Sequence, residues 1–398
     1  MICNKENCSA CQTCISVCPK NAIVMQQDKY GVPYPQVDME KCIHCNICKD
    51  VCPANRANEY KFPSNVYAAW STDKERRDKA ASGGLATEIY RYALANNIFI
   101  MGTYFDRKKG VFFQEVSKES DIEWARDSKY VYSDMKNCFL QYKQQLRKGR
   151  QCIFIGLPCQ VAAIKSYTDK FCSDEKDHLL TVDIICHGVP PFSYLDEHLH
   201  FIEKKTKQNV AGLSFRNSCS SFILKCFSKN GKIIYKKGMH TNDTYYRGFA
   251  VNLNFRENCY HCLYARNERI SDMTLGDYSG IGNLWPYDGK KQQISVVLCS
   301  SEKGNLFLSK LMDKGYVWAQ SRPLAEPASA IGNPQLRHPS VAYKTRNIFL
   351  QNYVKSRNFE KASRKALYKQ FFFYYLKVPY QILKEIVKFI INKVRKCI

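Results

Sequence analysis

Apolar positions along the chain form short runs that alternate with stretches of helical periodicity. Short runs of apolar and β-branched residues between turn residues are typical of strands, and apolar positions three and four residues apart are typical of helices. Strands are expected at residues 98–104, 151–155, 179–185, 232–235 and 294–298. Helices are expected at 85–96, 138–148 and 159–167. This alternation predicts a mixed core of the α+β or α/β class.

The first 60 residues follow a different pattern, in which one cysteine motif occurs twice. The run C-x2-C-x2-C-x3-C-P begins at Cys8 and recurs at Cys42, and an apolar run at 22–25 before Tyr30-Gly31 predicts a hairpin between the copies. In two-cluster ferredoxins the fourth cysteine of each run binds the other cube. The motif therefore predicts two 4Fe-4S clusters. The first is assigned to Cys8, Cys11, Cys14 and Cys52, and the second to Cys42, Cys45, Cys48 and Cys18.

Zinc is the alternative ligand for these cysteines. Structural zinc sites typically use paired C-x2-C motifs far apart, so two tandem runs favour the ferredoxin interpretation. Cys3 lies outside both runs and is expected to be a free or buried thiol. No apolar signal segment precedes the first motif, and we therefore expect a reducing, cytoplasmic location without disulfides.

Three later segments carry four further cysteines. They are Cys159 in GLPCQ, Cys186 in CHGVP, and Cys259 and Cys262 in CYHC. An ordinary buried thiol is the alternative for each one alone. However, Cys159 and Cys186 each follow a predicted strand at its carboxyl end, where α/β sheets place their ligands. Together the four could supply the thiolates of a third 4Fe-4S cluster.

The order of these segments, with Ser82-Gly83-Gly84 between the ferredoxin runs and GLPCQ, resembles one known family. It is similar to the beta subunit of coenzyme F-420 hydrogenase/dehydrogenase, fused to an N-terminal bacterial-type ferredoxin domain. Residues 255–277 carry the strongest likeness, which extends from residue 1 to about 350. The family usually has an aromatic residue at the position of Ser279, a departure that concerns the substrate and not the fold.

The resemblance implies an iron-sulfur flavoprotein that holds FAD. The loop at 82–84 precedes a predicted helix whose N–H groups could receive a pyrophosphate, although a serine cap with loop glycines is the alternative. Asp272 and Asp277 could bind ribose or flavin groups, or could be turn residues. Candidate FAD-binding residues are Ser82, Gly83, Gly84, Lys129, Asp272, Gly276 and Asp277. His187 is the candidate proton donor near the flavin, with a supporting hydrogen-bonded histidine as the alternative.

Positive charge is unevenly distributed along the chain. The net charge is +24, and residues 344–398 hold fourteen Lys and Arg against Glu360 and Glu385. This excess favours an acidic partner, such as a ferredoxin or flavodoxin. Apolar positions at helical spacing in 382–394 predict a basic amphipathic helix, which could lie on an anionic membrane surface or pack on the protein's own core. Nucleic-acid binding is disfavoured because no recognised module accompanies the charge.

These observations divide the chain into four expected parts. They are a two-cluster ferredoxin domain at 1–60, two parts of a flavin-binding core at 61–170 and 171–345, and a basic tail at 346–398. The leading hypothesis is a cytoplasmic, ferredoxin-linked oxidoreductase that moves electrons between 4Fe-4S clusters, FAD and a small-molecule or glycan-type acceptor. The alternatives are an electron-transfer subunit without its own substrate, and a reductase of a membrane-associated glycan or lipid intermediate.

Overall fold

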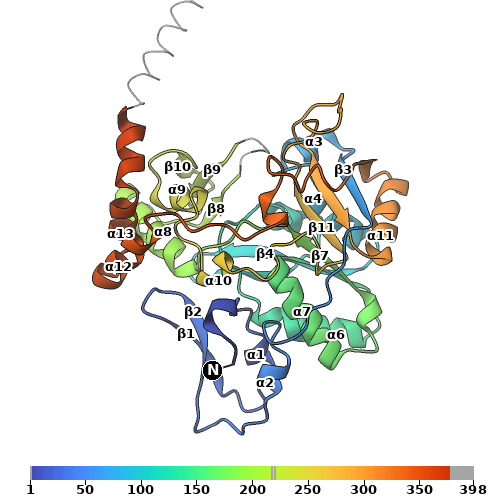
Figure 1. The fold of residues 1–398 in the computed structure, drawn as a ribbon, viewed down its shortest axis with the longest axis horizontal. Coiled ribbons are helices and arrows are strands. Elements are labelled where there is room, and N and C mark those ends of the chain that lie inside the picture. The colour runs from blue at the N-terminus through green and yellow to red at the C-terminus, as the bar shows by residue number, and fades with distance from the viewer. Residues whose placement is uncertain (1, 217, 219–220, 377–398) are drawn as a thin grey trace, which may run out of the picture.

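The computed structural model describes residues 2–216, 218 and 221–376, and it confirms the mixed α/β fold. Its centre is an eight-stranded sheet with the order β13-β3-β12-β11-β7-β6-β4-β5 (Figure 1). The strands are β3 (Asn65–Ser71), β4 (Phe99–Asp106), β5 (Gly110–Glu115), β6 (Cys152–Gly156), β7 (Leu179–Ile184), β11 (Met273–Asp277), β12 (Ser295–Cys299) and β13 (Val317–Ser321).

Four neighbouring strands of this sheet run parallel. β4, β6, β7 and β11 are parallel, whereas β5 and the strands β12, β3 and β13 add antiparallel pairs at the two sides. Ile153, Phe154 and Val182 in the parallel strands are buried, as expected for strands covered on both faces. The carboxyl ends of β6, β7 and β11 therefore meet at one edge of the sheet.

Helices cover both faces of the sheet. α4 (Leu85–Ala95) and α11 (Glu302–Asp313) share one buried cluster with Ile153, and α6 (Lys136–Arg147) and α7 (Pro158–Phe171) share another with Phe154. Successive strand residues point to opposite faces, so Ile153 and Phe154 belong to different cores. Short helices connect these elements: α3 (Lys74–Asp78), η2 (Glu119–Asp121), α5 (Ile122–Ala125), η3 (Lys176–His178) and η4 (Pro334–Leu336).

A third core, rich in aromatic side chains, lies beside the sheet. It contains Tyr194, Tyr245, Phe349 and Phe359, which come from four different helices. The elements are α8 (Phe192–Thr206), β8 (Gly212–Ser214), β9 (Ile223–Phe227), β10 (Ile233–Gly238), α9 (Thr244–Ala250), α12 (Arg346–Ser356) and α13 (Phe359–Ala366). The beginning of the predicted tail is thus packed into the protein, whereas the amphipathic helix predicted at 382–394 lies outside the described residues. Nowhere in the described part of the chain does a helix have the length and apolar character needed to cross a membrane.

The N-terminal module lies against the carboxyl edge of the parallel strands, next to α7 and α10 (Glu257–Tyr260) (Figure 1). Its elements are η1 (Lys5–Asn7), α1 (Thr13–Ser16), β1 (Ile23–Gln27), β2 (Pro33–Val37) and α2 (Ile47–Asp50). The structure confirms the predicted hairpin, in which Asp28 Oδ1 accepts hydrogen bonds from the N–H groups of Tyr30 and Val32. Ser166 on α7 donates a hydrogen bond to the Val51 carbonyl at 2.6 Å, which fixes the module to the sheet domain.

Candidate metal centres

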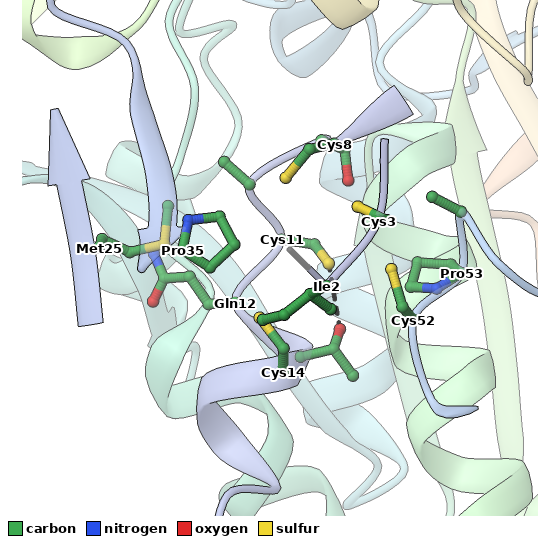
Figure 2. A pocket seen from close by; sticks show the side chains of 14 residues that line it. Ile2, Cys3, Cys8, Cys11, Gln12, Cys14, Met25, Pro35, Cys52 and Pro53 are labelled. Atoms are coloured by element: carbon green, nitrogen blue, oxygen red, sulfur yellow. Dashed lines mark hydrogen bonds between the residues drawn. The ribbon is translucent and has the colours of Figure 1, made fainter. Parts of the chain in front are cut away.

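The first cavity lies inside the N-terminal module and is lined by cysteine side chains (Figure 2). The loop from η1 into α1 folds tightly around it because Ala10 and Gln12 have φ values of 54° and 67°. The space measures about 370 Å³, its open mouth included. The structure brings together the four cysteines assigned to the first cluster, with one of them contributed by the second run. They are Cys8, Cys11, Cys14 and Cys52.

Cys3 is a fifth cysteine in this cavity. Hydrogen bonds with Cys52 and Cys8 raise the pKa of Cys3, and the bond with Cys3 lowers the pKa of Cys8 to about 7. The same contact is the main reason that the pKa of Cys52 is lowered. Cys3 therefore acts as an S–H donor that favours the thiolate form of two predicted cluster ligands.

The second cavity lies at the outer end of the module and is more open. It measures about 740 Å³, its open mouth included, and Cys45 is exposed there. Positive φ values at His44 and Asn46 shape the loop before α2. Ile2 lines both this cavity and the first one. The cysteines assigned to the second cluster all line it: Cys18, Cys42, Cys45 and Cys48.

The third cavity lies at the carboxyl edge of the parallel strands. Cys159 is in the first turn of α7, just after β6, and Cys186 follows β7. Cys259 is on α10 (Glu257–Tyr260), and Cys262 lies in the loop that follows. All four cysteines line one space of about 480 Å³, its open mouth included. Their role as ligands of a third cluster stays a prediction, which this convergence supports.

Burial makes three of these thiols, those of Cys159, Cys186 and Cys262, hard to ionise without a cation. Burial and the neighbouring Cys259 raise the pKa of Cys186 to about 12, and burial raises the pKa of Cys262 to about 11. Metal binding requires thiolates, so bound metal charge would offset this cost. Within the described ranges, no three His, Cys, Asp or Glu side chains converge as ligands of one metal ion. A cube holds its thiolates farther apart than one ion does, so the residues fit a cluster better than a single zinc.

A buried ion pair fixes the Cys262 loop to strand β7. Arg269 Nη2 lies 3.1 Å from both carboxylate oxygens of Asp183, and both side chains are almost completely buried. Burial raises the pKa of Asp183, and the Arg269 charge opposes that shift. Arg269 also donates to the carbonyls of Tyr264 and Arg266, so one side chain holds the loop that follows Cys262.

Arg256 forms the wall between the first and third cavities. It lines the third cavity, and its Nη1 donates a hydrogen bond to the carbonyl of Ser9, which lines the first. The guanidinium carbon lies 3.8 Å from the centroid of the Tyr132 ring. Sequence analysis did not identify Arg256 as a functional residue, although it lies three positions before Cys259.

Arg216 links two of the segments that carry candidate FAD residues. Arg216 Nη1 lies 3.1 Å from both Asp277 Oδ2 and the Tyr130 hydroxyl, and Nη2 donates to the Ala81 carbonyl. The Ala81 carbonyl directly precedes Ser82, so the loop before α4 and the end of β11 are linked through this one cation. Arg216 was also missed by sequence analysis, because nothing in its neighbourhood shows that it would be buried.

The glycines of this loop have specific steric roles. A Cβ on Gly83 would lie 2.5 Å from the Ala69 carbonyl oxygen and 2.7 Å from the Ser295 nitrogen. Gly84 has a φ of +88° at the N-cap of α4. Ser82 donates a hydrogen bond to the Ile294 carbonyl at 3.0 Å. The loop is therefore held against β3 and β12, with its glycines required by close packing.

The remaining candidates are separated from one another. Burial lowers the pKa of Lys129 to about 8, and its Nζ donates to the Trp124 carbonyl. Exposed His187 is at the third cavity. A Cβ on Gly276 would meet Ile185, so this glycine serves strand packing. Asp272 lies at the opposite end of β11, where its carboxylate accepts from Thr181 and Ser301, and the structure does not bring it to the others.

Comparison with known families agrees with this geometry. Residues 66–138 match the family model for the N-terminal part of the beta subunit of coenzyme F420 hydrogenase/dehydrogenase, and residues 149–323 match the model for its C terminus. The chain belongs to this beta-subunit family. Residues 7–56 match the 4Fe-4S dicluster domain, which supports iron-sulfur clusters in the N-terminal module of this family member.

A solved structure is also similar to this family member. It is the F420-reducing NiFe hydrogenase complex from Methanosarcina barkeri, studied by xenon derivatization, of which one chain is 18% identical. The alignment covers 78% of the present chain and 94% of that chain, with a TM-score of 0.42. Among curated proteins, none matches significantly.

Proposed function

We propose that this chain is an iron-sulfur flavoprotein oxidoreductase that passes low-potential electrons between three 4Fe-4S clusters, FAD and an organic acceptor. The observation that carries the proposal is the grouping of the twelve predicted cysteine ligands, four of them in each of three cavities. Ile2 is shared by the second and first cavities, and Arg256 joins the first to the third. When bound, the clusters would supply one-electron transfer.

The second cavity is the proposed entry point for electrons. It contains exposed Cys45, and the exposed lysines Lys20 and Lys49 line it. Positive charge around an exposed redox site attracts acidic partners and raises the rate of encounter. An acidic electron carrier such as ferredoxin or flavodoxin fits this surface.

The proposed FAD site lies at the loop before α4. Its backbone N–H groups begin an eleven-residue helix, and such helix ends favour phosphate groups. Arg77 Nε lies in this region, buried without a hydrogen-bond partner among the described atoms. Arg216 adds positive charge at this loop, where it donates a hydrogen bond to the Ala81 carbonyl. These residues fit an anionic cofactor, for which they would supply binding and orientation.

Anaerobic purification of the full chain, with iron, sulfide and flavin quantified together, tests the proposal. We expect about twelve irons and one FAD per chain. The Cys262→Ser variant should lower the iron content to about eight. The matched control is Cys138→Ser, because Cys138 is buried in α6 and lines none of the three cavities. A wild-type chain with about eight irons and no flavin would contradict the proposal.

A second candidate function is an electron-transfer subunit without its own substrate. The matched family is described as a beta subunit, which favours a role inside a larger assembly. Stable co-purification with a catalytic partner, together with no turnover of any organic acceptor by the isolated chain, would favour this alternative.

A further inference from the structure

Arg256 is a buried cation at the junction of two cysteine groups. Only 1% of the residue is exposed. It is the N-cap of α10, so Cys259 lies one turn farther along the chain. Its Nη1 donates to the Ser9 carbonyl in the wall of the first cavity, and the side chain itself lines the third cavity. One guanidinium therefore touches the walls of both cavities.

The groups that raise the pKa of this guanidinium are mainly cysteines. Burial alone would lower the pKa of Arg256, but Cys259, Tyr132, Cys159 and Cys8 together raise it. Two of these cysteines belong to the third cavity, and Cys8 belongs to the first. An isolated buried charge is costly, so a buried arginine needs anionic partners. Clusters bound by these cysteines would provide such anionic partners.

Two hydrogen-bond donors of Arg256 are unused. Its Nε and Nη2 atoms are buried and have no partner among the described atoms. Unpaired buried N–H groups are costly, and the sulfurs of a cluster are acceptors. The Tyr132 ring, 3.8 Å from the guanidinium carbon, packs against the group and restricts its orientation.

We propose that Arg256 is a positioning residue with two effects. It raises the reduction potentials of the clusters in the first and third cavities, and it fixes the walls of these two cavities relative to each other. The inference rests on the proposed function. When one electron moves between these clusters, one is oxidised and the other is reduced, and no bond or proton is exchanged. A fixed positive charge stabilises an electron added to either cluster, and hydrogen bonds to cluster sulfurs also raise the reduction potential.

Redox titration of the anaerobically purified full chain, monitored by electron paramagnetic resonance, tests this role. In Arg256→Gln we expect the potentials of two clusters to become more negative, whereas the third signal, from the exposed second cavity, stays unchanged. Arg256→Lys keeps the charge but lacks the planar fork of donors, so at least one of the same two potentials should shift. Arg56→Gln is the matched control, because Arg56 joins the module to α7 and lines none of the three cavities.

Each outcome of the titration supports or contradicts the role of Arg256. Unchanged potentials in both Arg256 variants would overturn the inference, and so would an equal shift of all three signals or the same shift in the Arg56 control. If the glutamine variant fails to assemble clusters, the lysine variant alone gives the answer. A wild-type iron content of about eight contradicts the third cluster and hence the proposed function. About twelve irons with unshifted potentials contradicts only the role of Arg256.

Discussion

The imidazole Nδ1 of His198 on α8 lies 2.5 Å from Oε1 of Glu360 on α13. The other ring nitrogen lies 3.0 Å from Oδ2 of Asp243, the N-cap of α9. Tyr235 and Thr244 donate further hydrogen bonds to these two carboxylates. This buried group therefore joins the helices of the aromatic core through one histidine.

We expect the protein to lose stability at alkaline pH because of His198. Burial alone would lower the pKa of His198, but Asp243 and Glu360 outweigh burial and raise it to about 10. The unfolded value is about 6.5, so the stabilisation is fully present below about pH 6.5 and is lost as the pH rises to about 10. Thermal unfolding midpoints of the anaerobic protein should fall across that range.

The variant His198→Gln tests the assignment. Removing one partner of a buried charge group costs about 3–5 kcal/mol, so its unfolding midpoint at pH 6 should be clearly lower. Its midpoint should also fall less steeply with alkaline pH. His200→Gln is the control on the same helix, because His200 is exposed and should leave the midpoint unchanged. An unaltered alkaline slope in His198→Gln would argue against this assignment.

Ser166 should control how firmly the ferredoxin module is attached. Its hydroxyl donates to the Val51 carbonyl and accepts from Arg56 Nη1 at 2.9 Å. Ser166→Ala leaves a buried carbonyl unpaired, at a cost of about 1–3 kcal/mol. We expect faster proteolytic cleavage within residues 55–64, which connect the module to β3. Ser173→Ala, at an exposed turn, should be cleaved at the wild-type rate; equal cleavage of both variants would refute this role.

Replacing Gly83 by alanine should destabilise the sheet domain. The new Cβ would collide with the backbone of β3 and β12, which cannot move away without disturbing the sheet. Overpacking of this kind costs about 1–3 kcal/mol, and we expect a lower unfolding midpoint and less bound flavin. Gly212→Ala is the control, since its Cβ would approach no atom closer than 3.8 Å. A Gly83→Ala protein as stable as this control would show that the contact is not restrictive.

The Arg269–Asp183 pair should be needed for the third cysteine group. Arg269→Met leaves Asp183 buried without its cation, which costs about 3–5 kcal/mol and frees the Cys262 loop. We expect the iron content to fall from about twelve to about eight, with the ferredoxin clusters retained. Arg266→Gln removes a more exposed pair with Glu268 and a contact with the Tyr60 ring, and it should keep all the iron. Full iron in Arg269→Met would contradict this anchoring role.

Local patterns predicted a large part of the fold. The predicted strand at 179–185 corresponds to β7, and the predicted helix at 85–96 corresponds to α4. Strand β3 was missed because its centre is Ala68 and Ala69, and alanine has little strand preference of its own. Pairing with β12 and β13 makes this segment a strand, and such pairing is not visible locally.

The candidate sites show the same limit. Cysteine spacing is a local feature, and all twelve predicted ligands converge in three cavities. The burial of Arg256 and Arg216 depends on distant segments, so neither residue could be distinguished from the many other cations of the chain. Asp272 was a candidate because of its motif, yet its carboxylate accepts a hydrogen bond from Ser301 at the start of α11.

The hairpin turn of the N-terminal module is clamped by elements from much later in the chain. Ser193 donates to the Gly31 carbonyl, Tyr194 donates to the Tyr30 carbonyl, and Arg357 donates to the Lys29 carbonyl. During synthesis the module leaves the ribosome before α8 and α12 have been made, because the chain emerges from its N-terminus. The hairpin turn therefore gains these three contacts only when the later helices have formed.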